Sequence, residues 1–177
     1  MKEKDAESRI QWSGRSWRLR VYQQTYKDGR TLEHGAIEHP GSVVIVPIIG
    51  DQVLLLSQYR LALDSTILEL PAGTRGWKED WLSCAQRELR EETGYRAANW
   101  LALGKIWPAP GISDELMAIY IATDLQGDPL PADIDEKIEL QPTLFEEASA
   151  MALDGRLQDA KSIIAILRAK GSLSKEA

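Results

Sequence analysis

The segment from Gly73 to Tyr95, GTRGWKEDWLSCAQRELREETGY, constrains this chain most, because its second half combines a helical pattern with many carboxylates. Glu88 and Glu92 are four residues apart, so in a helix they lie on one face, and Glu91 borders that face. Like charges at this spacing repel each other by a few tenths of a kcal/mol. A hard divalent cation would offset that repulsion, since Mg²⁺ prefers oxygen ligands and is commonly held by carboxylates plus substrate phosphates.

A purely structural interpretation also fits this helix. Glu and Arg alternate between Arg87 and Glu92, and most such runs are solvated faces with i,i+4 ion pairs. Arg87 and Glu91 have the spacing of such a pair. The helix taken alone favours this interpretation, so the spacing of the whole segment has to decide between the two.

That spacing resembles the Nudix box, the signature of the Nudix hydrolases. The defined positions of the motif are all present, in the order Gly73, Glu79, Arg87-Glu88-Leu89, Glu91-Glu92, Gly94 and the hydrophobic Tyr95. The probability that the fixed residues of this motif match by chance is on the order of 10⁻⁸ per starting position. The resemblance implies a loop–helix–loop that hydrolyses a nucleoside diphosphate linked to another group, with Mg²⁺ as the expected cofactor and Mn²⁺ as its alternative.

Position in that motif also implies individual roles. Glu88 and Glu92 are the expected metal ligands with Glu91 assisting, and the backbone carbonyl of Ala72 would join them. Arg87 is expected to hold a carboxylate in place, so Arg87 and Glu91 are candidates for catalytic roles as well. Apolar residues recur along the same helix at intervals of three and four, which predicts that this stripe packs on a sheet and that the metal ligands lie on the opposite, wetter face.

Two further segments resemble the ADP-ribose pyrophosphatase branch of the family, Gln58-Tyr59-Arg60 and Glu69-Leu70-Pro71-Ala72-Gly73. In that branch the arginine contacts the phosphate or terminal ribose side of the substrate, and the planar guanidinium of Arg60 suits phosphate oxygens. The resemblance suggests that Glu69 either contacts the substrate or supports a residue that does. A surface salt bridge for Arg60 and an exposed strand position for Glu69 are the structural alternatives.

Pro110, sixteen residues after Gly94, resembles another marker of this branch, and the pattern Pro-Gly-x-x-x-Glu strengthens the likeness. The resemblance implies that Pro110 shapes the substrate site and that Glu115 binds a ribose hydroxyl or supports the metal site. An ordinary turn proline and a charge at the start of a strand are the alternatives.

An acidic stretch, Ala132 to Lys137, occupies the place where this branch carries its catalytic base, and Glu136 is the expected base. Ile134 stands where the branch is often acidic, so the other carboxylates remain alternatives, namely Asp133, Asp135 and Glu139. The implied reaction converts ADP-ribose to AMP and ribose 5-phosphate. The alternatives are a nucleotide sugar or dinucleoside polyphosphate as substrate, or a nucleotide-sensing module without catalysis, whose motif glutamates are usually eroded.

Local patterns add further expectations for the fold. Alternating polar and apolar residues before residue 40 predict antiparallel strands with a hairpin turn at Asp28-Gly29. Ser42 to Ile49 is predicted to be a strand buried on both faces, with Pro47 marking a bulge or an edge. Thr143 to Glu146 fits a helix capping box, and Gly171 is predicted to stop the last helix.

These patterns and the resemblance together predict an α/β (α+β) fold. The expected architecture is a Nudix-type α/β/α sandwich with a mixed central sheet, plus a small N-terminal antiparallel strand unit. Residues 1–40 are expected to form an appendage for dimerisation and substrate binding, residues 41–171 the Nudix hydrolase domain, and residues 172–177 a flexible tail. The resemblance also implies a homodimer.

Composition narrows the function classes. The net charge of −6 and the pI of about 5.0 give no basic footprint for nucleic acid. The absence of an 18-residue apolar run, and a charged start that is unlike a signal peptide, predict no membrane partner and a cytoplasmic location. The single cysteine, Cys84, cannot form an internal disulfide and is expected to be a packing residue. The expected partner is therefore a small-molecule nucleotide.

Overall fold

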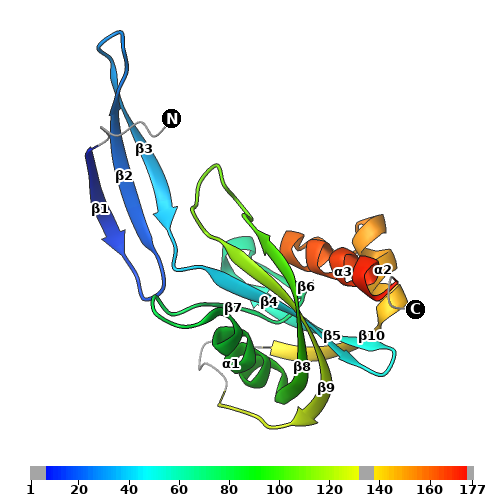
Figure 1. Cartoon of the computed structure of the whole chain (residues 1–177). Helices are drawn as coiled ribbons and strands as arrows, with labels where there is room; N and C mark the ends of the chain where they lie inside the picture. Colours follow the sequence, from blue (N-terminus) through cyan, green and yellow to red (C-terminus); the bar gives the residue numbers. More distant parts are fainter. Residues whose placement is uncertain (1–6, 132–137, 175–177) are drawn as a thin grey trace.

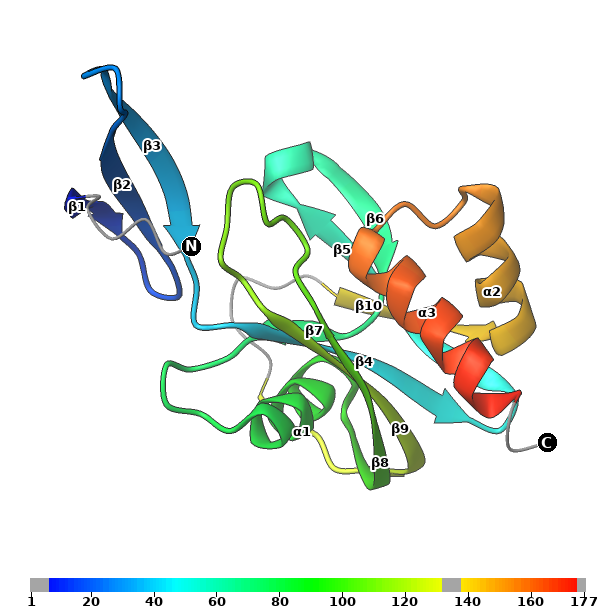
Figure 2. The same cartoon turned by 45° about the horizontal axis from the view of Figure 1, so that its top comes forward.

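The computed structural model describes residues 7–131 and 138–174, which form a layered fold with a separate sheet near the N-terminus (Figure 1). Within this described part, a seven-stranded mixed sheet has helix α1 (Trp81–Thr93) on one face and helices α2 (Phe145–Asp154) and α3 (Ala160–Leu173) on the other (Figure 2). The strands are β4 (Ser42–Ile49), β5 (Gln52–Arg60), β6 (Ser65–Glu69), β7 (Ala72–Thr74), β8 (Tyr95–Ile106), β9 (Met117–Gly127) and β10 (Ile138–Leu144). The predicted α/β/α sandwich with a mixed sheet is confirmed.

Strand β4 forms the centre of this sheet, whose main path runs β10-β5-β4-β9-β8, with β6 paired to β5 and β7 paired to β4. Its pairing with β9 is parallel, whereas β5 and β7 pair with it antiparallel. Side chains alternate between the two faces, so Val43 and Ile45 pack beneath α1 while Val44 and Val46 pack with α2 and α3. The strand is buried on both faces, as its sequence predicted.

Pro47 lies inside this central strand, so the expectation that it marks an edge is wrong. The ladder from β4 to β7 ends at Val44, and the ladder from β4 to β5 begins at Ile48. Pro47 therefore falls between two partner strands on that side, where its missing amide hydrogen removes no hydrogen bond from either ladder.

Helix α1 begins and ends at residues with strong capping preferences. The side chain of Asp80 accepts hydrogen bonds from the backbone N–H groups of Leu82 and Ser83, which satisfies donors at the start of the helix. Gly94 ends the helix with φ of 76°, a left-handed conformation that glycine adopts without strain. These two ends fix which side chains of α1 face β7.

The C-terminal helices differ from the prediction at their ends. Thr143 belongs to β10 and its hydroxyl donates to the carbonyl of Gln141, so the predicted capping box is wrong, and α2 starts without a side-chain cap. Helix α3 continues through Gly171 to Leu173. A helical glycine costs only about 1 kcal/mol relative to alanine, which does not stop a helix that packs on the sheet. No helix of the described residues is long and apolar enough to cross a membrane.

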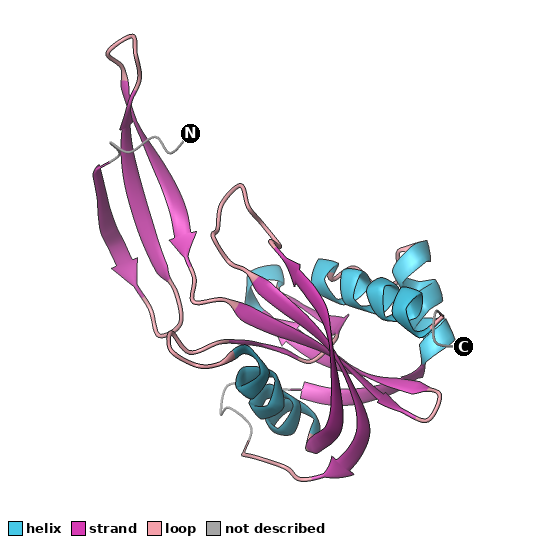
Figure 3. Cartoon of the chain, in the orientation of Figure 1, coloured by secondary structure: helices cyan, strands magenta, loops and turns pink. Residues whose placement is uncertain are grey.

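A separate antiparallel sheet precedes the sandwich and projects from it (Figure 3). It consists of β1 (Glu7–Ser13), β2 (Arg18–Thr25) and β3 (Thr31–Glu38). The predicted turn at Asp28-Gly29 joins β2 to β3, with Gly29 at φ of 85°. Large apolar side chains are exposed on this sheet, namely Ile10, Trp12, Trp17, Tyr22, Tyr26 and Leu32.

Candidate active site

The glutamates expected to bind metal face the short strand β7. Glu88 and Glu92 are each 8% exposed, so the expectation that they lie on a wetter side of α1 is wrong. Ala72 donates its backbone N–H to Oε2 of Glu92, with an N···O distance of 2.8 Å. A Cβ built on Gly73 would lie 1.8 Å from Cδ of Glu88. Strand β7 allows both carboxylates to be buried. Ala72 gives Glu92 a backbone donor, and Gly73 has no side chain in the space that the Glu88 carboxylate occupies.

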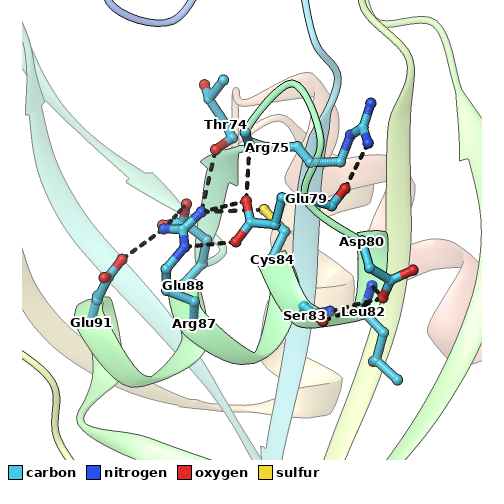
Figure 4. Close-up of polar contacts among 11 residues, drawn as sticks. Thr74, Arg75, Glu79, Asp80, Leu82, Ser83, Cys84, Arg87, Glu88 and Glu91 are labelled. Atoms are coloured by element: carbon cyan, nitrogen blue, oxygen red, sulfur yellow. Dashed lines mark hydrogen bonds and ion pairs between the residues drawn. The ribbon is translucent and has the colours of Figure 1, made fainter.

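Arg87 binds the carboxylates of this face together (Figure 4). Its Nη1 donates to Oε1 of Glu88 at 2.7 Å and to Oε2 of Glu91 at 2.8 Å. Its Nε and Nη2 donate to the two oxygens of Glu79 at 3.0 and 3.1 Å. The expected i,i+4 pair of Arg87 and Glu91 is therefore present, and Arg87 holds three carboxylates rather than one. Charge-assisted bonds of this kind fix the geometry of both partners.

Arg87 also sets the charge state of its neighbours. Its hydrogen bonds hold the pKa of Glu79 below the ordinary value, and Glu79, then Glu88 and Glu91, raise the pKa of Arg87. Burial, followed by the charges of Glu79 and Glu88, raises the pKa of the Cys84 thiol to about 12. The thiol therefore stays protonated at neutral pH, and its complete burial agrees with the expected packing role.

The donor set of this face fits a hard divalent cation. Glu88, Glu91 and Glu92 offer carboxylate oxygens, and the backbone of Ala72 lies beside Glu92. Among the residues that the structure describes, no three Asp, Glu, His or Cys side chains converge as a closed metal cluster. Glu88 and Glu91 instead accept from the same nitrogen of Arg87. This arrangement suits an open site that substrate phosphates complete, which is how proteins usually hold Mg²⁺.

A second group of charges lies at the ends of β5 and β6. Arg60 donates from Nε to Oε1 of Glu69 at 2.6 Å and from Nη2 to Oε2 at 2.7 Å. Glu69 is 1% exposed, so it is a buried partner of Arg60 rather than an exposed strand residue. The bonds to Glu69 chiefly raise the pKa of Arg60, and the negative charges of Glu92 and Asp159 contribute. Lys161 of α3 also donates to Glu69, and the sequence analysis missed it.

A cavity of about 690 Å³ adjoins the metal-binding face, a volume typical of small-molecule sites. Its lining includes Glu88 together with Arg15 and Ser16, which lie in the turn between β1 and β2. Trp77, in the loop before α1, also lines it, and the guanidinium of Arg18 lies 4.6 Å from the centre of that ring. The N-terminal sheet therefore closes one side of the space beside the glutamates.

Pro110 and Glu115 lie in the loop between β8 and β9, away from that lining. Oε1 of Glu115 accepts a hydrogen bond from the hydroxyl of Ser42, at the start of β4, at 2.5 Å. Pro110 lines a smaller hollow with Trp107 and Ile112. The structure thus brings Glu115 to the end of β4 that pairs with β7, and it places Pro110 apart from the glutamates.

The expected catalytic base, Glu136, lies outside the described residues, as do the alternatives Asp133 and Asp135. The remaining alternative, Glu139, is an exposed residue of β10 opposite Ser57 of β5. The identity of the base therefore stays a prediction.

The fold is an α/β/α sandwich, and helix α1 presents a buried glutamate that an arginine of the same helix binds. This combination defines a hydrolase of the kind that uses divalent metal ions. The NUDIX domain model matches residues 38–165, and the chain belongs to the Nudix hydrolase family. Members of this family act on small-molecule nucleotide compounds.

Known proteins resemble the chain over most of its length. It is 32% identical to the methanol dehydrogenase activator of Bacillus methanolicus, over 93% of this chain and 90% of the relative. It is 29% identical to the ADP-ribose pyrophosphatase of Bacillus subtilis (strain 168), over 88% of this chain and 85% of the relative. The crystal structure of an ADP compounds hydrolase matches with a TM-score of 0.84 at 22% identity, covering 98% of this chain and 95% of that one. That last likeness concerns the fold alone.

Proposed function

We propose that this protein hydrolyses the diphosphate linkage of ADP-ribose to AMP and ribose 5-phosphate, with Mg²⁺ as the cofactor. The observation that carries this proposal is the complete set of motif glutamates on one side of α1. Glu88 and Glu92 are buried against β7, Arg87 binds Glu79, Glu88 and Glu91, and the Ala72 amide binds Glu92. Two relatives named ADP-ribose pyrophosphatase, from Bacillus subtilis and Mycobacterium tuberculosis, support the choice of substrate.

Each group of residues has a defined task in this reaction. Glu88, Glu91, Glu92 and the Ala72 carbonyl are the proposed metal ligands; the bound ion would neutralise phosphate charge and lower the pKa of water. Arg87 keeps Glu88 and Glu91 oriented and the Ala72 amide holds Glu92, so that the ligands need little rearrangement when substrate enters. Arg60 binds phosphate oxygens near Glu92, and Glu69 holds Arg60 in place.

The remaining proposed contacts belong to the sugar side of the substrate. Glu115 binds a ribose hydroxyl from its position beside Ser42. Pro110 gives its loop a fixed shape, since proline restricts the backbone.

A substrate panel tests the proposed activity. With Mg²⁺ present, we expect ADP-ribose to give the highest kcat/KM among ADP-ribose, NADH, a nucleotide sugar, a diadenosine polyphosphate and 8-oxo-dGTP, and EDTA to abolish turnover. Preferred cleavage of another compound would retain the metal role of α1 but discard the ADP-ribose assignment. Tight binding without cleavage of any compound would make the nucleotide-sensing module the better interpretation.

The proposed base is Glu136, which would take a proton from the attacking water. Replacing Glu136 with glutamine is expected to lower kcat by about 10²-fold to 10³-fold, because general bases contribute on that scale. Steady-state kinetics with ADP-ribose measure the effect. If Glu136→Gln retains wild-type turnover, the same measurement on Asp133→Asn, Asp135→Asn and Glu139→Gln identifies which neighbour acts instead.

We also propose that residues 1–40 form an appendage for dimerisation and substrate binding and that residues 41–171 form the catalytic domain. The expected tail from residue 172 is wrong at its start, because α3 extends to Leu173. The exposed apolar side chains of β1 to β3 support a homodimer, and Arg15 and Ser16 in the cavity wall support a substrate role. Sedimentation velocity tests the dimer. A cytoplasmic location stays a prediction, which cell fractionation would test.

A further inference from the structure

The first turn of α3 reaches the charges around Arg60. Nζ of Lys161 donates to Oε2 of Glu69, the same oxygen that accepts from Nη2 of Arg60, and it lies 2.9 Å from Oδ2 of Asp159. The Lys161 side chain is 13% exposed and the Glu69 side chain 2% exposed. One buried carboxylate is thus shared by two cations from distant parts of the sequence.

The same turn is also anchored to the strand that leads into the metal-binding face. The backbone N–H of Leu70 donates to Oγ of Ser162 at 2.7 Å, which holds α3 against the end of β6 (Figure 2). Two residues further on, Ala72 holds Glu92. Because both anchors lie on one short segment, the position of Lys161 relative to Arg60 and Glu92 is fixed by the fold.

The balance of charge around Arg60 depends on Lys161. The two basic side chains, Arg60 and Lys161, match in number the two carboxylates that they contact, those of Glu69 and Asp159. Without Lys161 the cluster would carry a net negative charge, and the whole charge of Glu69 would act on Arg60. When the charge of Arg60 is neutralised by a buried carboxylate, its guanidinium attracts the phosphate oxygens of a substrate less strongly.

We propose that Lys161 is a positioning residue for substrate binding: by sharing the Glu69 carboxylate, it leaves the charge of Arg60 available to the diphosphate. This role rests on the proposed hydrolysis of a diphosphate and deepens it, because it assigns part of the substrate affinity to α3. Neither the Nudix motif nor the Arg60 and Glu69 segments contain Lys161, which lies 92 residues from Glu69.

Replacing Lys161 with methionine tests this role, since methionine keeps the length of the side chain and removes its charge. We expect KM for ADP-ribose to rise about tenfold while kcat changes less than about twofold, the pattern of lost binding rather than lost chemistry. Lys161→Arg should restore KM to within about threefold of wild type, because it restores the charge. Lys170→Met is the matched control, since Lys170 lies on the same helix and pairs with Glu146 on the protein surface.

A second variant separates this role from a loss of structure. Combining Lys161→Met with Glu69→Gln removes both charges of the pair, so the buried Glu69 carboxylate is not left without its lysine partner. We expect this double variant to bind substrate better than Lys161→Met alone, because Arg60 no longer faces the whole charge of Glu69, but less well than wild type, because glutamine holds Arg60 with fewer bonds. An unchanged KM in Lys161→Met, or a loss confined to kcat and melting temperature that Glu69→Gln does not reverse, would overturn the proposal.

The outcome for Lys161 can be read apart from the outcome for the proposed activity. If the wild type does not cleave ADP-ribose, the proposed hydrolysis fails by itself. Calorimetric titration of ADP-ribose without divalent cation into the same variants then decides the role of Lys161: about tenfold weaker binding to Lys161→Met supports it, and equal binding overturns it.

Discussion

Replacing Glu92 with glutamine is expected to lower kcat for ADP-ribose by about 10³-fold, which corresponds to about 4 kcal/mol. Glutamine has nearly the same size, and its amide oxygen can still accept the hydrogen bond that the backbone of Ala72 donates to Glu92. The substitution therefore removes the negative charge and keeps this bond. A hard divalent cation loses an anionic oxygen ligand, and the neutral amide replaces it poorly.

Steady-state kinetics with Mg²⁺ measure this loss, and thermal unfolding checks that the fold is retained. Glu146→Gln serves as the control, because the Glu146 side chain is 78% exposed on α2 and its surface ion pair with Lys170 contributes little to stability. We expect this control to keep its turnover within about twofold of wild type. Wild-type turnover in Glu92→Gln would remove Glu92 from the metal site and leave Glu88 and Glu91 as the ligands to test.

The parts of the site that lie close together in the sequence could be predicted from it. Helical periodicity alone puts Glu88 and Glu92 on one face, and it gives Arg87 and Glu91 the spacing of an ion pair. Asp80 and Gly94 mark the two ends of α1, because their side-chain and backbone preferences act within one turn. The central strand β4 could be predicted for the same reason, since its continuous β-branched run is a local signal.

The environment of those residues could not be predicted, because it depends on pairing between distant segments. The burial of Glu88 and Glu92 follows from the approach of β7, whose pairing to β4 is set by tertiary structure. A helical wheel distinguishes the apolar face of α1 from its polar face. It does not show that β7, with Gly73 at the point of contact, covers the polar face.

Lys161 and Ser162 are the clearest examples of this limit. The two C-terminal helices show ordinary amphipathic patterns, which indicate that they pack on the sheet and indicate nothing about contacts with Glu69 or Leu70. The contacts of Lys161 with Glu69 and of Ser162 with Leu70 each span 92 residues, so no local spacing announces them. A polar residue in the first turn of a helix can cap the helix, face solvent or contact another element. Only the packing of α3 beside β6 shows that Lys161 and Ser162 contact that strand and the residue after it.

Replacing Gly73 with alanine is expected to lower kcat/KM by about 10²-fold while changing stability by about 1 kcal/mol or less. The new Cβ would lie 1.8 Å from Cδ of Glu88 and 2.0 and 2.2 Å from its two oxygens. The carboxylate is the end of a flexible side chain, so it can turn away and the fold survives. Its displacement breaks the bond with Arg87 and moves a proposed metal ligand, and misplacement on the scale of 1 Å can cost about 10²-fold in rate.

Kinetics with ADP-ribose and thermal unfolding together distinguish this effect from general damage. Gly127→Ala is the matched control, because no heavy atom lies within 4 Å of the Cβ that it would gain. We expect Gly127→Ala to keep wild-type kcat/KM. Gly73→Ala should combine a nearly unchanged melting temperature with a large loss of turnover, because the clash is relieved by moving Glu88 rather than the backbone. If Gly73→Ala kept full activity, the position of Glu88 beside β7 would not matter to the reaction, and the metal site would depend on Glu91 and Glu92 instead.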